Sequence, residues 1–365
     1  MYIRAGEVKM DKVFQRKKSG IFLDDGCRNS GVLSWVRILE YSSNVELVLL
    51  DRNDLCEQKL SELDLLLCPG GWSRRQLEVM GETGRNAVCN YIYSGGAYLG
   101  ICAGAFNVMN RPGRLQLIPF DWLPERDCET AMLTTELTSV GKSVLNIDQL
   151  RYKVRYAAGP VMISAPLTGG AEFEVLAVYK SSVSPQDHAP YDFLDTPAIV
   201  RGKYGKGTIV AVSFHPESNE STYELACACV HAASGVEIEP CFPVKEARPV
   251  RAGFMSHSTI TPQCARELLE LEKNRKIDVK LINNADLDAG VLNHVDVLIV
   301  PDGNPEVNGK LFLPEFRQKQ LDRFIRNGGI IISSGNGAWS LGNFPQTRVP
   351  AGEYFSSAVT DCFKM

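Results

Sequence analysis

The stretch GGAYLGICAGAF, residues 95–106, decides the fold of this 365-residue chain. Two glycines precede an apolar run that leads into Cys102, and small residues surround the cysteine: Gly100 before it, Ala103 and Gly104 after it. A strand that enters a helix through a turn of small residues forms a nucleophile elbow, which holds the apical side chain at the carboxyl edge of a sheet. The alternative is a structural thiol buried in a strand. The small residues favour the elbow, and a helix N-terminus there would favour the thiolate.

The segments before the elbow alternate between strands and helices. Apolar runs predict strands at 19–25, 45–51 and 63–71, the last closing on a glycine-rich turn. Apolar residues at helical spacing predict helices at 32–41 and up to residue 93. Continuous apolar strands separated by helices indicate an α/β fold, in which a parallel sheet is covered on both faces.

The same order returns near the C-terminus. Strands are expected at 250–256, 277–283, 295–304 and 327–339, and helices at 262–274 and around Leu321. When the two copies are aligned on their paired glycines, Gly96 meets Gly329 and Cys102 meets Gly335. An internal duplication explains this pattern. The second copy lacks a nucleophile and stops soon after its turn, so we expect a truncated half domain.

The pattern of strands and helices divides the chain into three segments. We predict an N-terminal extension at residues 1–18, a domain with the reactive cysteine at 19–240, and the degenerate second copy at 250–365. The boundary falls in a proline-rich stretch between the last two. Because the second copy is short, we expect it to pack against the first rather than stand alone.

The amino-acid composition argues against nucleic-acid-binding, membrane-spanning and secreted proteins. The formal net charge of −4 argues against nucleic acid as the main partner, because phosphate-binding surfaces carry a basic excess. No apolar window approaches the roughly 18 residues of a membrane span, and the first twenty residues lack the centre of a secretion signal. Cysteines such as Cys68 and Cys229 lie in apolar runs, which fits reduced thiols. We expect a cytoplasmic protein without membrane contact, metal or other cofactor.

A thiolate nucleophile needs a base, and the base needs an acid that orients it. The segment GTIVAVSFHPESN, residues 207–219, delivers His215 and Glu217 at the end of an apolar strand. The other four histidines have no such setting. Backbone donors for an oxyanion are expected from Ala103, directly after the nucleophile, and from Gly70 or Gly71 in the turn that ends the neighbouring strand.

The segment RGKYGKGTIV, residues 201–210, is superficially similar to a phosphate loop. It lacks the Gly-Lys-Ser/Thr ending, since Gly207 is followed directly by Thr208. We predict a hairpin turn between two strands instead.

The motifs PGG, GICAGAF and SFHPE, in this order, resemble those of the class I glutamine amidotransferase superfamily. The likeness is closer to the N-terminal domain of biotin-protein ligases, including the segment VRYAAGPVMI at 154–163. The resemblance implies a flavodoxin-like sheet, with Cys102 as nucleophile, His215 as base and Glu217 as its orienter. It also makes three residues candidates for substrate loops: Trp72, Tyr156 and Gly159.

Two features depart from that family. Ala157 and Ala158 replace an asparagine and a glycine of its loop, and no ligase domain or biotin loop is found, so ligation is not expected. The first hypothesis is a cysteine hydrolase or amidotransferase that attacks a carboxamide or acyl group of a small molecule through a thioester, with any ammonia acceptor a separate protein. The second is a non-catalytic regulatory or binding module. An intracellular peptidase is a third, but its histidine usually follows the nucleophile, where this chain has Ala103.

Overall fold

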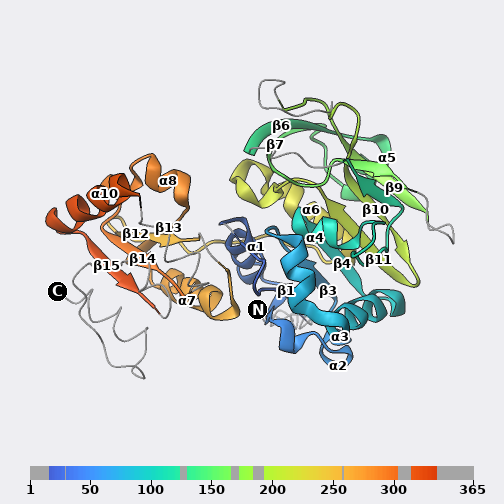
Figure 1. The fold of residues 1–365 in the computed structure, drawn as a ribbon, viewed down its shortest axis with the longest axis horizontal. Coiled ribbons are helices and arrows are strands. Elements are labelled where there is room, and N and C mark those ends of the chain that lie inside the picture. Colours follow the sequence, from blue (N-terminus) through green and yellow to red (C-terminus); the bar gives the residue numbers. More distant parts are fainter. Residues whose placement is uncertain are drawn as a thin grey trace, which may run out of the picture.

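The structure, a computed structural model, describes residues 16–28, 30–123, 130–165, 172–183, 193–256, 259–302 and 314–334. None of the helices in these segments has the length and apolar character that crossing a bilayer requires. Two sheets built on parallel strands organise the chain, one in each predicted copy (Figure 1). A short antiparallel pair, β5 (Phe120–Trp122) with β8 (Met162–Ser164), accompanies the larger sheet.

The larger sheet has nine strands in the order β2-β1-β3-β4-β11-β10-β9-β6-β7. Their bounds are β1 (Lys17–Phe22), β2 (Val45–Leu50), β3 (Leu65–Cys68), β4 (Ala97–Ile101), β6 (Thr130–Leu137), β7 (Arg151–Ala157), β9 (Phe173–Tyr179), β10 (Pro197–Tyr204) and β11 (Gly207–Val212). From β2 to β11 neighbours pair in parallel, and the remaining pairs are antiparallel. Every residue of β3, β4 and β11 is buried, which explains their continuous apolar character. The predicted parallel sheet and the hairpin of β10 and β11 are confirmed.

Helices cover this sheet on both faces. They are α1 (Ser30–Glu40), α2 (Glu57–Leu60), α3 (Ser73–Ser94), α4 (Ala103–Val108), α5 (Ser139–Leu145) and α6 (Tyr223–Ser234), with 3-10 turns η1 (Arg52–Asp54), η3 (Pro216–Ser218) and η4 (Glu220–Thr222). Helices α3 and α4 pack together against β11, and α6 packs on β4 and β11 beside α5. The helix predicted up to residue 93 is α3, but it is kinked at Gly81, whose φ of 62° is not helical.

The second sheet has the order β13-β12-β14-β15, with all strands parallel. Its elements are β12 (Val250–Met255), α7 (Pro262–Lys273), β13 (Ile277–Ile282), α8 (Asn284–Asp288), η5 (Val291–His294), β14 (Val297–Val300), α10 (Glu315–Arg326) and β15 (Ile330–Ser333). This order repeats β2-β1-β3-β4 of the first copy. The predicted second copy of the pattern is therefore confirmed at the level of topology.

The two copies also agree in side-chain detail at the amino edge of each sheet. The backbone N–H of Lys18 donates to Asp64 Oδ2 at 2.9 Å, and the N–H of Arg251 donates to Asp296 Oδ2 at 2.9 Å. In each case the aspartate opens the third strand and fixes its register against the first. The equivalence shows that the copies share strand register as well as strand order.

A second equivalence lies where each fourth strand begins. A Cβ on Gly96 would lie 2.3 Å from the ring of Tyr91, and one on Gly329 would lie 2.4 Å from the ring of Phe324. Each aromatic residue therefore requires a glycine beneath it. Counting on from these glycines places Gly335, the predicted counterpart of Cys102, outside the described residues.

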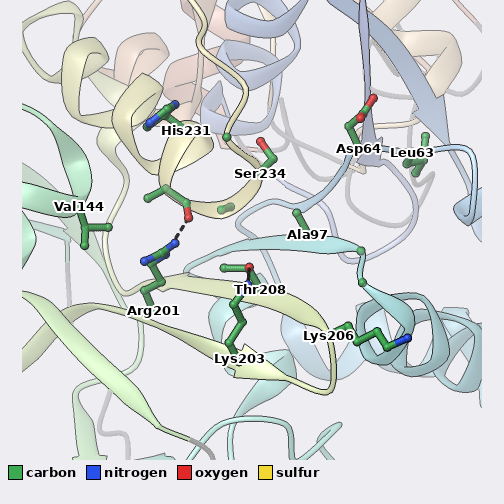
Figure 2. Close-up of a pocket in the computed structure, with 15 residues that line it drawn as sticks. Leu63, Asp64, Ala97, Val144, Arg201, Lys203, Lys206, Thr208, His231 and Ser234 are labelled. Atoms are coloured by element: carbon green, nitrogen blue, oxygen red, sulfur yellow. Dashed lines mark hydrogen bonds between the residues drawn. The ribbon is translucent and has the colours of Figure 1, made fainter.

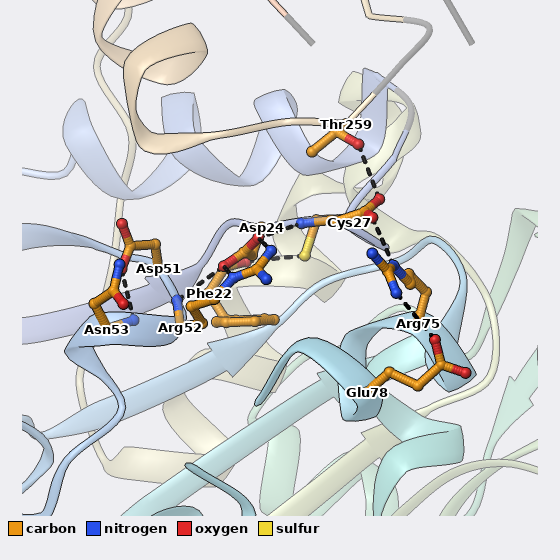
Figure 3. Close-up of polar contacts among 10 residues, drawn as sticks. Phe22, Asp24, Cys27, Asp51, Arg52, Asn53, Arg75, Glu78 and Thr259 are labelled. Atoms are coloured by element: carbon orange, nitrogen blue, oxygen red, sulfur yellow. Dashed lines mark hydrogen bonds and ion pairs between the residues drawn. The ribbon is translucent and has the colours of Figure 1, made fainter. Parts of the chain in front are cut away.

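The second copy packs against the first through α7, which contacts α1 and β2. At this junction Arg37 Nε lies 2.8 Å from Glu272 Oε1. Figure 3 shows a second polar link, in which Thr259 donates to Asp25 at 3.1 Å while Arg75 holds the same carboxylate at 2.6 Å. Buried side chains of both copies belong to one continuous apolar cluster, so the junction is part of the core.

Candidate active site

Cys102 occupies the sharp turn between β4 and α4. Its φ of 50° and ψ of −99° belong to neither a strand nor a helix. The N–H of Cys102 donates to Val212 O at 2.8 Å, and its carbonyl accepts the N–H of Phe106 at 3.0 Å. These bonds tie the turn to the end of β11 and to the first turn of α4. The backbone has the form of a nucleophile elbow, with the cysteine alone at its apex.

Glycines on either side of the elbow allow backbone segments to touch. A Cβ on Gly104 would lie 1.9 Å from the carbonyl oxygen of Cys68, at the end of β3. A Cβ on Gly100 would lie 2.5 Å from the carbonyl oxygen of Gly104. Neither neighbour can retreat, because both are backbone atoms. The small residues seen in the sequence are thus required by the close approach of α4 to the sheet.

His215 follows the neighbouring strand β11 and is fixed from two sides. The backbone N–H of His215 donates to Arg155 O at 2.9 Å, and the ring nitrogen Nδ1 lies 2.8 Å from Glu217 Oε1. Both side chains are buried, with 1% of His215 and none of Glu217 exposed. A Cβ on Gly70 would lie 2.5 Å from Cε1 of the imidazole. Gly70 therefore makes room for the ring.

The imidazole of His215 lies between Glu217 and Cys102. Burial alone would lower the pKa of His215, but the Glu217 carboxylate and the Cys102 sulfur outweigh it and raise this pKa to about 10. Nε2 makes no hydrogen bond of standard geometry to any described residue, so it is available on the side away from Glu217. The structure thus brings the three predicted triad residues together, Cys102 from the turn before α4 and the other two from the turn η3 after β11.

The predicted oxyanion donors lie around the same point. Gly71 has a φ of 140°, and a Cβ there would lie 2.0 Å from Gly26 O, so only glycine fits. Within the described part of the chain, the N–H groups of Gly70, Gly71 and Ala103 have no hydrogen-bond acceptor. Unpaired N–H groups beside a nucleophile are the donors that an oxyanion requires.

Two buried amides that the sequence reading does not identify connect the glycine turn to the elbow helix. Asn107 Nδ2 donates to Gln76 Oε1 at 2.8 Å, and Gln76 Nε2 donates to Pro69 O at 3.0 Å. Neither residue is exposed to solvent. The available signal is a polar residue one turn into the small, apolar helix that follows Cys102. This pair holds the candidate oxyanion turn at a fixed distance from α4.

The loop after β7 covers the thiol. Cys102 Sγ donates to Ala157 O at 3.5 Å, and only 4% of Cys102 is exposed. The next residue, Ala158, has a φ of 53°, in the left-handed region that costs a non-glycine residue about 1 kcal/mol. Ala157 and Ala158 are the two residues that depart from the family pattern. The departure therefore lies directly over the candidate nucleophile.

Hydrogen bonds beneath this loop hold it against the sheet. Ser213 Oγ donates to Pro160 O at 2.7 Å, and Tyr179 OH donates to Ser213 Oγ at 2.8 Å. Tyr156 OH donates to Gly159 O at 2.7 Å. Of the candidate substrate-loop residues, Tyr156 is thus buried under the loop and Gly159 forms part of its backbone. Their observed contacts support the loop.

Trp72, the third such candidate, lies at the N-cap of α3 and is 52% exposed. The guanidinium carbon of Arg28 lies 5.4 Å from the centre of its ring. Its side chain faces solvent beside the glycine turn. No group of three histidine, cysteine, aspartate or glutamate side chains in the described segments is arranged to bind a metal.

The site geometry can now be set beside known proteins. Residues 41–111 match the family model "Biotin-protein ligase, N terminal". The match confirms the predicted resemblance over this stretch, which contains the Gly70 turn and Cys102 but neither His215 nor Glu217. No curated protein sequence matches the chain.

Three solved structures are similar to part of the chain. A glutamine amidotransferase is 20% identical and covers 60% of this chain and 99% of its own, with a TM-score of 0.41. A ThuA-like protein from Bacteroides uniformis ATCC 8492 is 16% identical and covers 62% of this chain and 95% of its own, with a TM-score of 0.43. PurLQS from Thermotoga maritima is 14% identical and covers 60% of this chain and 99% of its own, with a TM-score of 0.45.

Proposed function

We propose that the chain is a cysteine-dependent hydrolase or amidotransferase that acts on a carboxamide or related acyl group through a thioester. The observation that carries the proposal is the convergence of Cys102 with His215 and Glu217, which follow two neighbouring strands, at the carboxyl edge of one sheet. The 2.8 Å contact of Glu217 with Nδ1 directs the other ring nitrogen of His215 toward the remaining partner, Cys102.

In the first half of the reaction, His215 holds the proton and the Cys102 thiolate attacks the carbonyl carbon. The N–H groups of Ala103 and the glycine turn stabilise the oxyanion. As the C–N bond breaks, His215 gives its proton to the departing nitrogen, and the acyl group remains on sulfur.

In the second half, His215 acts as a base toward water. Water attacks the thioester while His215 takes its proton, the C–S bond breaks, and the carboxylic acid leaves. The raised pKa of His215 favours the protonated ring at neutral pH, which suits the first half. The family resemblance makes a primary carboxamide such as the glutamine side chain the first substrate class to test. Ammonia released in this way would be used by a separate acceptor protein.

A second candidate function is a non-catalytic regulatory or ligand-binding module. The observation that favours it is the cover over Cys102, since the thiol bonds to Ala157 O and is almost fully buried. Hydrolysis requires the loop after β7 to move away from Cys102 when substrate binds, whereas a binding module requires no such movement.

Alkylation of the full chain tests the activated thiol. We expect iodoacetamide at about pH 6 to modify Cys102 at least about tenfold faster in the native sequence than in His215→Gln. Peptide-level mass spectrometry would follow Cys102 together with the exposed Cys56 and Cys241, which serve as internal controls. Because Cys102 lies under the same cover in both chains, the ratio reports on the imidazole. Equal rates in both chains would remove the enzyme proposal.

Ammonia release tests turnover. Glutamine and a series of other primary carboxamides would be incubated with the native chain and with Cys102→Ala. Turnover by the native chain that Cys102→Ala lacks supports hydrolysis. An activated thiol without turnover on any carboxamide would favour the binding module.

A further inference from the structure

The described residues form an open cavity of about 540 Å³ at the edge of the larger sheet opposite Cys102 (Figure 2). It lies where β4 and β11 begin, at Ala97 and Thr208, and is closed by the C-terminal end of α6. Cys102 follows the far end of the five-residue strand β4, so the two places are about 16 Å apart at about 3.3 Å per residue. The cavity is therefore separate from the candidate active site.

The hairpin of β10 and β11 supplies the positive wall of this cavity. Arg201 and Lys203 are two residues apart on β10 and therefore share a face, and Lys206 lies at the turn. Arg201 Nε donates to Ala232 O at 2.9 Å, and Lys203 Nζ donates to Thr208 Oγ1 at 2.7 Å. These two partners are neutral, so they hold the side chains in place and add no opposing charge.

The negative groups near the cavity are already engaged. Asp64 is the one carboxylate among the lining residues, and it accepts Lys17 Nζ at 3.0 Å and the N–H of Lys18 at 2.9 Å. Outside the lining, Glu174 approaches Arg201 Nη1 at 3.7 Å and is half exposed. Three cationic residues thus line the cavity in a chain whose net charge is −4. A local positive surplus against the overall charge is the electrostatic pattern of an anion site.

The second copy provides an internal comparison. A cavity of about 310 Å³ lies at the same edge of its sheet, bordered by Asp296, Gly328 and Gly329 and by α10 rather than by a counterpart of α6. There Arg251 closes on Asp296, with Nη2 2.6 Å from Oδ1, and the described residues include no hairpin corresponding to β10 and β11. Arg323 also lines the second cavity, so what distinguishes the first copy is the hairpin that carries Arg201, Lys203 and Lys206.

We propose that this cavity binds a phosphate-bearing small molecule. Its volume is in the range of small-ligand sites, and the fork of Arg201 beside the ammonium of Lys203 suits the oxygens of a phosphate group. The wall is formed by the segment RGKYGKG, residues 201–207. In the proposed site its side chains on β10 and at the turn contact the phosphate, whereas a phosphate loop would do so with its backbone N–H groups. This ligand site does not depend on the proposed chemistry at Cys102.

Calorimetric titration of the full chain with inorganic pyrophosphate at low salt tests the site. The variant Lys203→Gln/Lys206→Gln is expected to bind at least about tenfold more weakly than the native chain. The matched control Lys153→Gln/Lys280→Gln removes the same charge from exposed strand positions on β7 and β13 and is expected to bind as tightly as the native chain. Circular dichroism would show that both variants are folded.

Three results would overturn the proposal: no saturable binding of pyrophosphate by the native chain, equal weakening in the control variant, or equally tight binding of citrate, which would show an anion site without preference for phosphate. Cys102→Ala is expected to bind pyrophosphate like the native chain. The phosphate site therefore stands or falls independently of the hydrolase.

Discussion

Glu217 Oε1 lies 2.8 Å from His215 Nδ1 in a place where neither side chain is reached by solvent. Burying an isolated carboxylate is costly unless it is paired, so this contact stabilises both groups in one orientation. The same contact leaves Nε2 as the ring nitrogen that the proposed mechanism uses. Four predictions follow from the surroundings of this pair.

Glu217→Gln keeps the shape of the side chain and its oxygen acceptor but removes the negative charge. We expect the pKa of His215 to fall, because the carboxylate is the largest of the influences that raise it. The pH profile of Cys102 alkylation should shift accordingly, with a slower rate near neutral pH. Glu220→Gln, at an exposed position in the next 3-10 turn, is the control and should leave the profile unchanged. A profile that is identical in both variants would exclude the proposed role of Glu217.

The stability of the native chain relative to His215→Gln should depend on pH. The pKa of His215 rises from 6.5 to about 10 on folding, so the folded state binds the proton more tightly than the unfolded state. This contribution is fully present below about pH 6.5 and is lost as pH rises toward about 10. Urea unfolding of both proteins at several pH values in this window would measure the difference. A difference that grows with pH would contradict the assignment.

Gly70→Ala should displace the imidazole, since the new methyl group would lie 2.5 Å from Cε1 of His215. Overpacking of this kind costs about 1–3 kcal/mol of unfolding free energy. In a His215→Ala background the same substitution should cost much less, because the ring is gone. Denaturation of the four chains as a double-mutant cycle would measure the coupling. Additive effects would show that Gly70 and His215 are not in contact.

Ser213→Ala should loosen the loop that covers Cys102. The substitution removes the bond to Pro160 O and leaves Tyr179 OH without its acceptor, at a cost of about 1–3 kcal/mol. We expect faster native-state alkylation of Cys102. Tyr179→Phe is the matched comparison, because it removes the Tyr179 bond and retains the bond from Ser213 to Pro160. Similar labelling rates in the two variants would show that Ser213 does not secure the cover.

The elbow and the grouping of Cys102, His215 and Glu217 can be predicted from sequence, because each group directly follows a short apolar strand. An apolar strand must deliver its last residues to the carboxyl edge of a parallel sheet, so Cys102 and His215 meet once their strands are neighbours. Gln76 and Asn107 cannot be identified in this way, because their partners are set by how α3 packs on α4. The kink at Gly81 is equally invisible, since the surrounding residues have ordinary helical character.

The antiparallel extension formed by β6, β7 and β9 is the largest part of the described fold that the sequence reading does not identify. Its strands alternate between buried and exposed residues and are linked by long connections, so their pairing order has no local signal. The cover over Cys102 belongs to this extension. Tyr156 points toward the core because it shares the buried face of β7 with Tyr152 and Val154, at a spacing of two residues. This spacing becomes informative only once the strand is recognised.

The aspartate and glycine contacts shared by the two copies lie at the opposite edge of each sheet from the elbow. The sheet architecture and the proposed chemistry of this protein therefore depend on different sets of residues. A lineage that exchanged the thiol at the elbow would retain these contacts, so the proposed catalytic end and the scaffold that carries it are free to change separately.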